Sequence, residues 1–536
     1  MTQPLNPVEL EIARNRLESI AEEVGLALIK TSYSPNIKDR RDCSAGLYTP
    51  DGTLISQAEH IPLHLGVMPE FIRTVLNEYG VDNLVDGDVL ITNNPYLRGS
   101  HLPDACVITP IFVDERLVAV VANMAHHVDV GGIAPGSMAT YATEIFQEGI
   151  RIPPVKLYSA GELQRELLNV LMTNVRTADK TRGDLMAQVA ANRLGERRVE
   201  ELVQEWGAEY FIRACEELAD YAERRTRTAL ESLPDGSGEF TDHLEHNGVG
   251  EERLEIHVAV TKSGDRLTVD FSKTDLAGAG AVNCSAAVTQ ACVAYVVKLI
   301  ADATLPSNAG LMRPITVRTR PGTLVDAQFP DPVSNGNIQT AQRIVDTLLG
   351  AFHQIAPDLV PAASSGSMSI MTIGGRDFRT GRYFSYVETY GGGQGAMPGQ
   401  DGAHAIHTHM TNTRNTPCEV IEQEYPLRVG EYAVADRTGG AGEYTGGDGL
   451  IRTLTLVGGE AVVIAGTART DQGPWGLNGG ADGAKASVEY IRRFGEQDEA
   501  TELQEAMSRG ALASGDAVRI QTAGGGGYGA PRQADN

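Results

Sequence analysis

The chain has 536 residues, of which 42% are hydrophobic and 21% charged, so it is expected to fold into about two to four domains or lobes. Its 45 Lys and Arg residues against 70 Asp and Glu give a formal net charge of −25, which argues against binding to the phosphate backbone of nucleic acids. No apolar run approaches the roughly 20 residues that span a bilayer, so no membrane association is expected.

The N-terminal part is expected to begin with an amphipathic helix over Pro7–Ser32, where apolar residues recur at three- and four-residue steps. A hairpin follows, with short strands at Cys43–Thr49 and Thr53–Ala58 around the turn Pro50-Asp51-Gly52. Met68–Tyr79 is predicted to form the next helix.

Three strands are predicted next, at Asp88–Asn93, Ala105–Val113 and Leu117–His127. The third is apolar at almost every position until its final histidines, which is typical of a strand buried on both faces. Because the second and third strands are joined by a short turn, they are expected to be antiparallel neighbours. The loop Asn94–Asp104 therefore lies beside the end of the third strand.

The remaining chain alternates between helical and strand patterns. Gly161–Leu233 is rich in Leu, Ala, Glu and Arg and predicts at least two helices, whereas residues 254–272 have the period of two that indicates a hairpin. Further helices are expected at about Ser285–Ala303 and Thr340–Ile355. From about Pro426 onward the chain has only strand and glycine patterns.

These patterns predict an α+β fold with mixed, largely antiparallel sheets, helical layers and a β-rich C-terminal region. The expected regions are an N-terminal α/β region with a helical segment (1–235), a central α+β region (236–425) and the C-terminal region (426–536).

Six cysteines are scattered along the chain without a C-x-x-C pair, which is typical of reduced, buried thiols. The first residues, MTQPLNPVELEIARN, lack the features of a secretory signal peptide. A cytoplasmic location is therefore expected. The cysteines are Cys43, Cys106, Cys215, Cys284, Cys292 and Cys418.

The first candidate site combines His101 and Asp104 from the loop with His126, His127 and Asp129 at the end of the third strand. Two imidazoles and a carboxylate with an open position suit zinc, manganese or iron(II). His126 and His127 point to opposite faces of their strand, so at most one of them shares a face with the loop pair. The alternative is that these histidines only cap strand ends, and the pattern leaves both interpretations open.

The second candidate site is the segment Asp401–Glu419, where His407, His409 and Arg414 are expected to bind substrate. A loop so rich in directional polar groups favours a functional interpretation over a polar connector. In the third candidate, HIPLHLG, the histidines His60 and His64 are expected to be structural.

Two common enzyme motifs are absent from the sequence. There is no G-x-x-x-x-G-K-[ST] loop, so no ATP-binding residues are predicted, and no G-x-S-x-G motif of a serine hydrolase. The glycine runs GGDG, GGADG and GGGG are interpreted as turns or as sites of close backbone approach.

Five motifs, in order, resemble the hydantoinase B family over nearly the full chain. This family comprises the B-type subunits of ATP-dependent hydantoinases, 5-oxoprolinases and lactamases, and is related to the alpha-type subunits of acetone and acetophenone carboxylases. The motifs are DRRDCSAGLY with HIPLHLG and MP, GDVLITNNPYLRGSHLPD, ANMAHHVDVGG, THMTNTRNTPCE and GGGGYG.

The resemblance implies a division of labour. A separate A-type subunit, built like actin and sugar kinases, would bind ATP, and this B-type chain would carry a divalent metal and complete the reaction. In the related carboxylases two histidines and an aspartate hold the metal, and by motif they fall on His101, Asp104 and His126. His127 or Asp129 would orient a ligand or move a proton. The expected assembly is a heterotetramer with two copies of each subunit.

The implied activity is the opening of a small cyclic amide, a hydantoin, oxoproline or lactam, after its activation with ATP by phosphorylation or through carboxyphosphate. One alternative is a subunit of an ATP-dependent ketone carboxylase, although this chain is shorter than those large subunits. Another is a non-catalytic scaffold that stabilises its ATPase partner.

Overall fold

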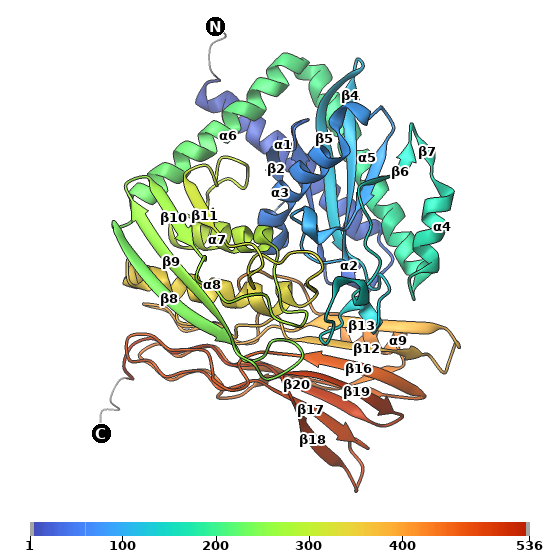
Figure 1. Ribbon diagram of the computed structural model, residues 1–536, viewed down its shortest axis with the longest axis vertical. Helices are drawn as coiled ribbons and strands as arrows, with labels where there is room; N and C mark the ends of the chain where they lie inside the picture. The colour runs from blue at the N-terminus through green and yellow to red at the C-terminus, as the bar shows by residue number, and fades with distance from the viewer. Residues whose placement is uncertain (1–4, 59, 532–536) are drawn as a thin grey trace.

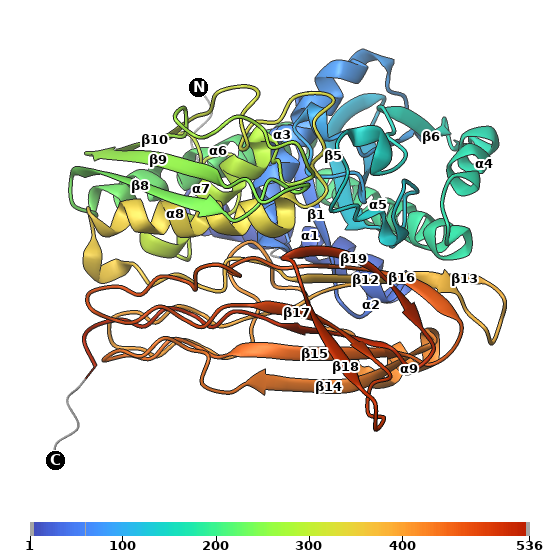
Figure 2. The same cartoon turned by 60° about the horizontal axis from the view of Figure 1, so that its bottom comes forward.

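A computed structural model describes residues 5–58 and 60–531. Figure 2 shows a body of helices and sheets from the N-terminal and central parts of the chain, stacked on a layer of β-sheets from the C-terminal part. The expected α+β class with largely antiparallel sheets is confirmed. Within the described ranges, no helix combines the length and the apolar character needed to cross a membrane.

The first sheet is antiparallel and has the strand order β2-β1-β5-β4-β3-β6-β7. Alternate residues of β5 contact different cores: Val120 and Ala122 pack with helix α3, and Ala119 and Val121 pack with α1 and α5. This explains why β5 is apolar on both faces. The strands are β1 Cys43–Tyr48, β2 Leu54–Gln57, β3 Val89–Thr92, β4 Asp104–Val113, β5 Arg116–His126, β6 Val155–Ser159 and β7 Glu162–Leu163.

Helices cover both faces of this sheet (Figure 1). The helix that was expected to begin at Met68 begins at Pro62, because proline fits the first helical turn, where its missing N–H has no helical partner. Its further proline, Pro69, lies inside the helix. The helices of this part are α1 Pro7–Thr31, α2 Pro35–Lys38, α3 Pro62–Tyr79, α4 Arg165–Thr173, α5 Ala178–Trp206 and α6 Ala208–Glu231.

The second sheet has the order β11-β10-β9-β8 and includes the predicted hairpin, β9 and β10. Helix α8 packs on β8 and β9, and α7 packs on α8 and on α3. Gly66 makes the last contact possible, because a Cβ atom there would lie 2.2 Å from the Cα of Ala291. The elements are β8 Gly236–Leu244, β9 Leu254–Ser263, β10 Arg266–Asp270, α7 Ala286–Ile300, β11 Ile315–Arg318 and α8 Ala341–His353, which follows a π-helical turn at Gly336–Thr340.

Two further sheets, β13-β12-β16-β19 and β14-β15-β20-β17-β18, pack face to face around a shared apolar core. The strands β12 and β13 come from before residue 426, and their sheet, β13-β12-β16-β19, lies next to the body of helices and sheets (Figure 2). The elements are β12 Ile370–Arg376, β13 Tyr383–Thr389, α9 Cys418–Glu424, β14 Leu427–Ala435, β15 Gly449–Leu456, β16 Glu460–Gly466, β17 Ser487–Arg492, β18 Ala500–Gln504, β19 Met507–Ala513 and β20 Ala517–Gln521.

The glycine runs form a bundle of backbones in close contact. The N–H of Gly525 donates to the carbonyl of Gly447, and the N–H of Gly447 donates to the carbonyl of Gln394, each at 2.8 Å. A Cβ atom on Gly525 would lie 2.0 Å from the carbonyl oxygen of Gln394. Side chains are therefore excluded here because backbone packs directly on backbone.

Candidate metal centre

The antiparallel register of β4 and β5 brings two of the predicted ligands together. Asp104, the first residue of β4, is directly opposite His126, the last residue of β5. His101 reaches the same place through a turn in which the N–H of Asp104 donates to the His101 carbonyl at 3.2 Å. All three side chains are buried.

The three side chains form a compact cluster. His101 Nε2 lies 3.2 Å from Asp104 Oδ2, and the rings of His101 and His126 meet edge to face with centroids 5.1 Å apart. One ligand atom from each residue lies within 4.8 Å of the others. Sequence reasoning therefore selected residues that the fold does bring together.

The donor atoms of the cluster fit a divalent cation. Within the described residues, Asp104 Oδ1 is buried without a hydrogen-bond partner, and such a carboxylate oxygen is costly to leave unpaired. His101 Nδ1 lies 3.0 Å from the carbonyl oxygen of Ser334, to which it donates, so in the neutral ring Nε2 is the nitrogen that can bind a metal. Two imidazoles and a carboxylate are ligands for zinc, manganese or iron(II).

The electrostatics of the cluster favour the ligand forms of Asp104 and His126. Burial alone would raise the pKa of Asp104, but His101 and His64 hold it well below its ordinary value. Burial lowers the pKa of His126 to about 4, so this ring is neutral at pH 7. Burial also disfavours a charged His101, but the adjacent Asp104 raises the pKa of His101 above its ordinary value.

Glu148, a buried residue that the sequence analysis missed, supports the Ser334 carbonyl to which His101 donates. Glu148 Oε1 accepts the N–H groups of Val333 and Ser334, each at 2.8 Å, and Ser334 in turn accepts the His101 Nδ1 proton. Burial raises the pKa of Glu148 to about 7. Glu148 therefore fixes the backbone that sets the orientation of His101.

His64 also lies at the cluster, although the sequence predicted a structural role for it. It projects from α3, with Nε2 3.7 Å from Asp104 Oδ2 and Nδ1 3.1 Å from Ser44 Oγ. Only the packing of α3 on the sheet brings it there. No spacing within the sequence gave a signal for this contact.

His127 and Asp129 lie away from the cluster. His127 directly follows the last residue of β5, and its side chain packs against α5, with Nε2 2.9 Å from Gln188 Oε1. Asp129 accepts the N–H groups of Gly131 and Gly136 at 3.0 and 3.1 Å and pairs with Arg176 at 3.0 Å. Both residues hold the chain that follows β5.

Three neighbours of His407, His409 and Arg414 in the predicted substrate segment lie at the metal cluster. A cavity of about 40 Å³ at the cluster is lined by Met410, Thr411 and Thr413 from this segment. The Arg414 side chain is exposed. Burial lowers the pKa of His407 to about 3, and within the described chain its ring nitrogens have no hydrogen-bond partner.

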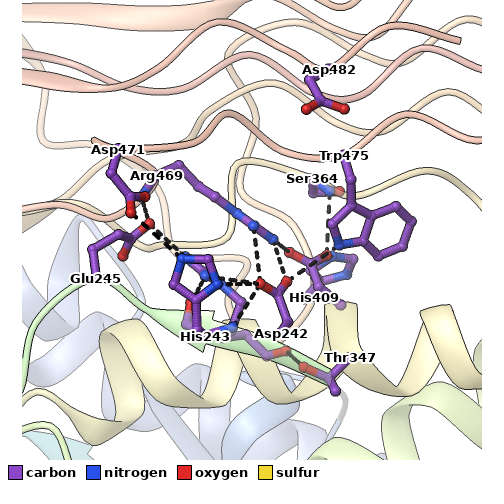
Figure 3. Close-up of polar contacts among 12 residues, drawn as sticks. Asp242, His243, Glu245, Thr347, Ser364, His409, Arg469, Asp471, Trp475 and Asp482 are labelled. Atoms are coloured by element: carbon purple, nitrogen blue, oxygen red, sulfur yellow. Dashed lines mark hydrogen bonds and ion pairs between the residues drawn. The ribbon is translucent and has the colours of Figure 1, made fainter. Parts of the chain in front are cut away.

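His409 belongs to a buried network of charges between the helical body and the C-terminal sheets (Figure 3). Its Nε2 lies 3.2 Å from Asp346 Oδ1 on α8, and Asp346 Oδ2 lies 3.0 Å from Arg469. Arg469 also pairs with Asp242 on β8 at 2.9 Å. His409 therefore anchors the segment whose next residues line the cavity.

Comparisons with known proteins extend over almost the whole chain. A model of the family described as hydantoinase B/oxoprolinase matches residues 6–531. The 5-oxoprolinase 1 of Arabidopsis thaliana is 34% identical over 97% of this chain, but the chain spans only 42% of that relative.

Two solved structures share the fold. The ATP-dependent caprolactamase from Pseudomonas jessenii matches with a TM-score of 0.89 and 29% identity, over 98% of this chain and 92% of that one. An acetone carboxylase, in its nucleotide-free structure, matches with a TM-score of 0.90 and 18% identity, over 98% of this chain and 76% of that one. The second likeness concerns the fold alone.

Proposed function

The chain belongs to the hydantoinase B/oxoprolinase family, and from that premise we propose that it is the metal-bearing subunit of an ATP-dependent enzyme that hydrolyses a cyclic amide. The observation that carries this proposal is the buried cluster of His101, Asp104 and His126, with one carboxylate oxygen of Asp104 left without a partner among the described residues. The 5-oxoprolinase and caprolactamase relatives support the reaction class.

The chemistry of a cyclic amide explains the need for both ATP and a metal. Its carbonyl is a poor electrophile, because attack destroys the amide resonance, and activation with ATP offsets that barrier. A divalent ion held by His101, Asp104 and His126 would polarise the carbonyl and lower the pKa of water. Zinc, manganese and iron(II) are the candidates for this ligand set.

The residues around the cluster have positioning roles in this proposal. The Ser334 carbonyl, held by Glu148, fixes the ring of His101. His127 and Asp129 hold the end of β5 and the turn after it, and so act through His126. In the substrate segment, the contact of His409 with Asp346 holds the residues that follow His409 in place at the cavity. His407 and Arg414 are proposed to bind substrate as it enters.

The proposal assigns ATP to a partner. The sequence lacks a P-loop, and the plant 5-oxoprolinase is more than twice as long as the part that this chain matches, which leaves room in that protein for an ATP-binding part. We propose that an A-type ATPase subunit supplies this part here, in a heterotetramer with two copies of each chain. The isolated chain is then expected to hydrolyse no ATP.

The test is to assay this chain with an A-type subunit, ATP and three rings: 5-oxoproline, hydantoin and caprolactam. The expected result is ATP-dependent opening of a ring with no gain of carbon, which is lost in the His101→Ala complex. Incorporation of labelled bicarbonate into a product from acetone would instead support a carboxylase. Full activity of the His101→Ala complex would leave only a scaffold role.

A further inference from the structure

Hydrogen-bond donors outside the metal cluster also line its cavity. Arg40 follows α2, is only 2% exposed, and reaches across to β13 of the C-terminal part. Its NH1 donates to the Val387 carbonyl at 2.8 Å and its NH2 donates to Thr389 Oγ1 at 3.0 Å. Its Nε–H is buried without an acceptor in the part of the chain that the structure describes.

Threonine hydroxyls add to these donors. Thr389 Oγ1 lies 3.3 Å from Thr413 Oγ1, which lies 3.3 Å from Thr411 Oγ1. These three hydroxyl groups form a row joined by two hydrogen bonds. Each hydrogen bond uses one hydroxyl hydrogen, so the third hydrogen has no acceptor within the row, whichever hydroxyl donates. All three residues are buried and line the cavity with Arg40.

We propose that Arg40, Thr389, Thr411 and Thr413, here called the donor wall, bind an anionic oxygen group of the substrate. This inference rests on the proposed function and deepens it, because it gives the substrate a negatively charged group. That group is either a carboxylate on the ring or the phosphoryl group added by activation. The metal cluster and the donor wall line one cavity, so the group and the amide carbonyl are bound close together.

The charge of the wall favours an anion over a neutral polar group. Arginine donates and never accepts, and the ion pair of Arg40 with Asp42 is long, at 3.8 Å. Buried donors without acceptors are costly, and hydrogen bonds from a guanidinium to an anionic oxygen are among the strongest in proteins. A purely structural role for Arg40 explains its contacts with β13, but it gives the Nε–H no acceptor among the described residues and the spare hydroxyl hydrogen no acceptor within the row.

The experiment uses the complete complex with its ATPase partner and a matched pair of rings, 5-oxoproline and 2-pyrrolidinone, which lacks the carboxylate. The variants are Thr411→Val, which removes one hydroxyl at nearly constant volume, Thr411→Ser, which keeps it, and Arg40→Lys. KM and kcat are measured for both rings, and thermal unfolding and bound metal are measured in parallel.

We expect Thr411→Val to raise KM or lower kcat/KM by about tenfold or more, with metal content unchanged and with partial recovery in Thr411→Ser. A loss confined to 5-oxoproline identifies the ring carboxylate, and an equal loss for both rings identifies the phosphoryl group. If Arg40→Lys does not fold, the comparison of Thr411→Val with Thr411→Ser still tests the donor wall. Unchanged KM and kcat in Thr411→Val, while the wild type opens a ring, would overturn the donor wall alone. A wild-type complex that opens neither these rings nor hydantoin or caprolactam would overturn the proposed function.

Discussion

Asp104 and His126 are paired directly across β4 and β5, so the hydrogen-bond register of the sheet sets the separation of two of the proposed metal ligands. The neighbouring His127 points to the other face and contacts Gln188 on α5. These two adjacent histidines therefore have separate environments. His126 lines the cavity, and His127 lies between the sheet and α5.

His126→Gln and His127→Gln should therefore have different effects. His126→Gln should lower activity of the complex by about 100-fold or more, because it removes a proposed ligand. His127→Gln should keep the metal but lower the free energy of unfolding by about 1–3 kcal/mol, because it disturbs a buried hydrogen bond. Metal analysis, activity and chemical denaturation compare the two. Equal metal loss in both variants would contradict the separation of roles.

Glu148 should control metal affinity from outside the cluster. Glu148→Leu removes the acceptor of the Val333 and Ser334 N–H groups, so the carbonyl that orients His101 loses its support. We expect metal affinity to fall about 10–100-fold, as for other groups that orient metal ligands. Glu148→Gln keeps an acceptor oxygen and serves as the matched control. Competition with a chelator measures the metal affinity of both variants. An unchanged affinity in Glu148→Leu would contradict this role of Glu148.

The low pKa of His407 predicts an acid-dependent loss of stability. Burial holds the folded-state pKa at about 3, whereas the unfolded chain titrates near 6.5, so the unfolded state binds more protons between these values. The contribution of His407 to the free energy of unfolding is complete above pH 6.5 and is lost as the pH falls towards 3. Between pH 5.5 and 4.5 wild type should lose about 1.4 kcal/mol more stability than His407→Gln. Denaturant unfolding at both pH values measures the difference. An equal change in the free energy of unfolding in wild type and variant would refute the prediction.

Asp346 should be important for stability, because it is fully buried and shared by His409 and Arg469. Asp346→Asn leaves the Arg469 charge partly uncompensated and should destabilise the protein by about 3–5 kcal/mol. The exposed pair of Asp436 and Arg437 is the control, and Asp436→Asn should cost less than about 1 kcal/mol. Chemical denaturation ranks the two, and similar small costs would show that the network in Figure 3 is not essential to the fold.

The parts of the site that lie on neighbouring strands were predictable from the sequence, and those brought in by tertiary packing were not. Strand alternation and the short turn between β4 and β5 placed His101 and Asp104 beside one of His126 and His127, and the family resemblance then selected His126. His64 lies on α3 and Arg40 lies just after α2, and only the tertiary packing of these two segments reveals their positions.

The same distinction applies to the fold. Hairpins and amphipathic helices follow from local periodicity, and they were predicted. The glycine runs were expected to be turns or close approaches, but the segments that meet there, such as those of Gly525 and Gln394, are distant in sequence. Likewise His409 has a charged partner on α8 that no spacing indicates.

The most direct test of the account is the metal content of the wild-type chain and of Asp104→Asn, purified in parallel and measured by mass spectrometry of the elements. Asparagine preserves the shape of the side chain but removes the charge that a divalent ion requires at this buried position. We predict about one divalent ion per wild-type chain and almost none in the variant, which should still fold. A wild-type chain that is free of metal and fully active in its complex would contradict the central claim.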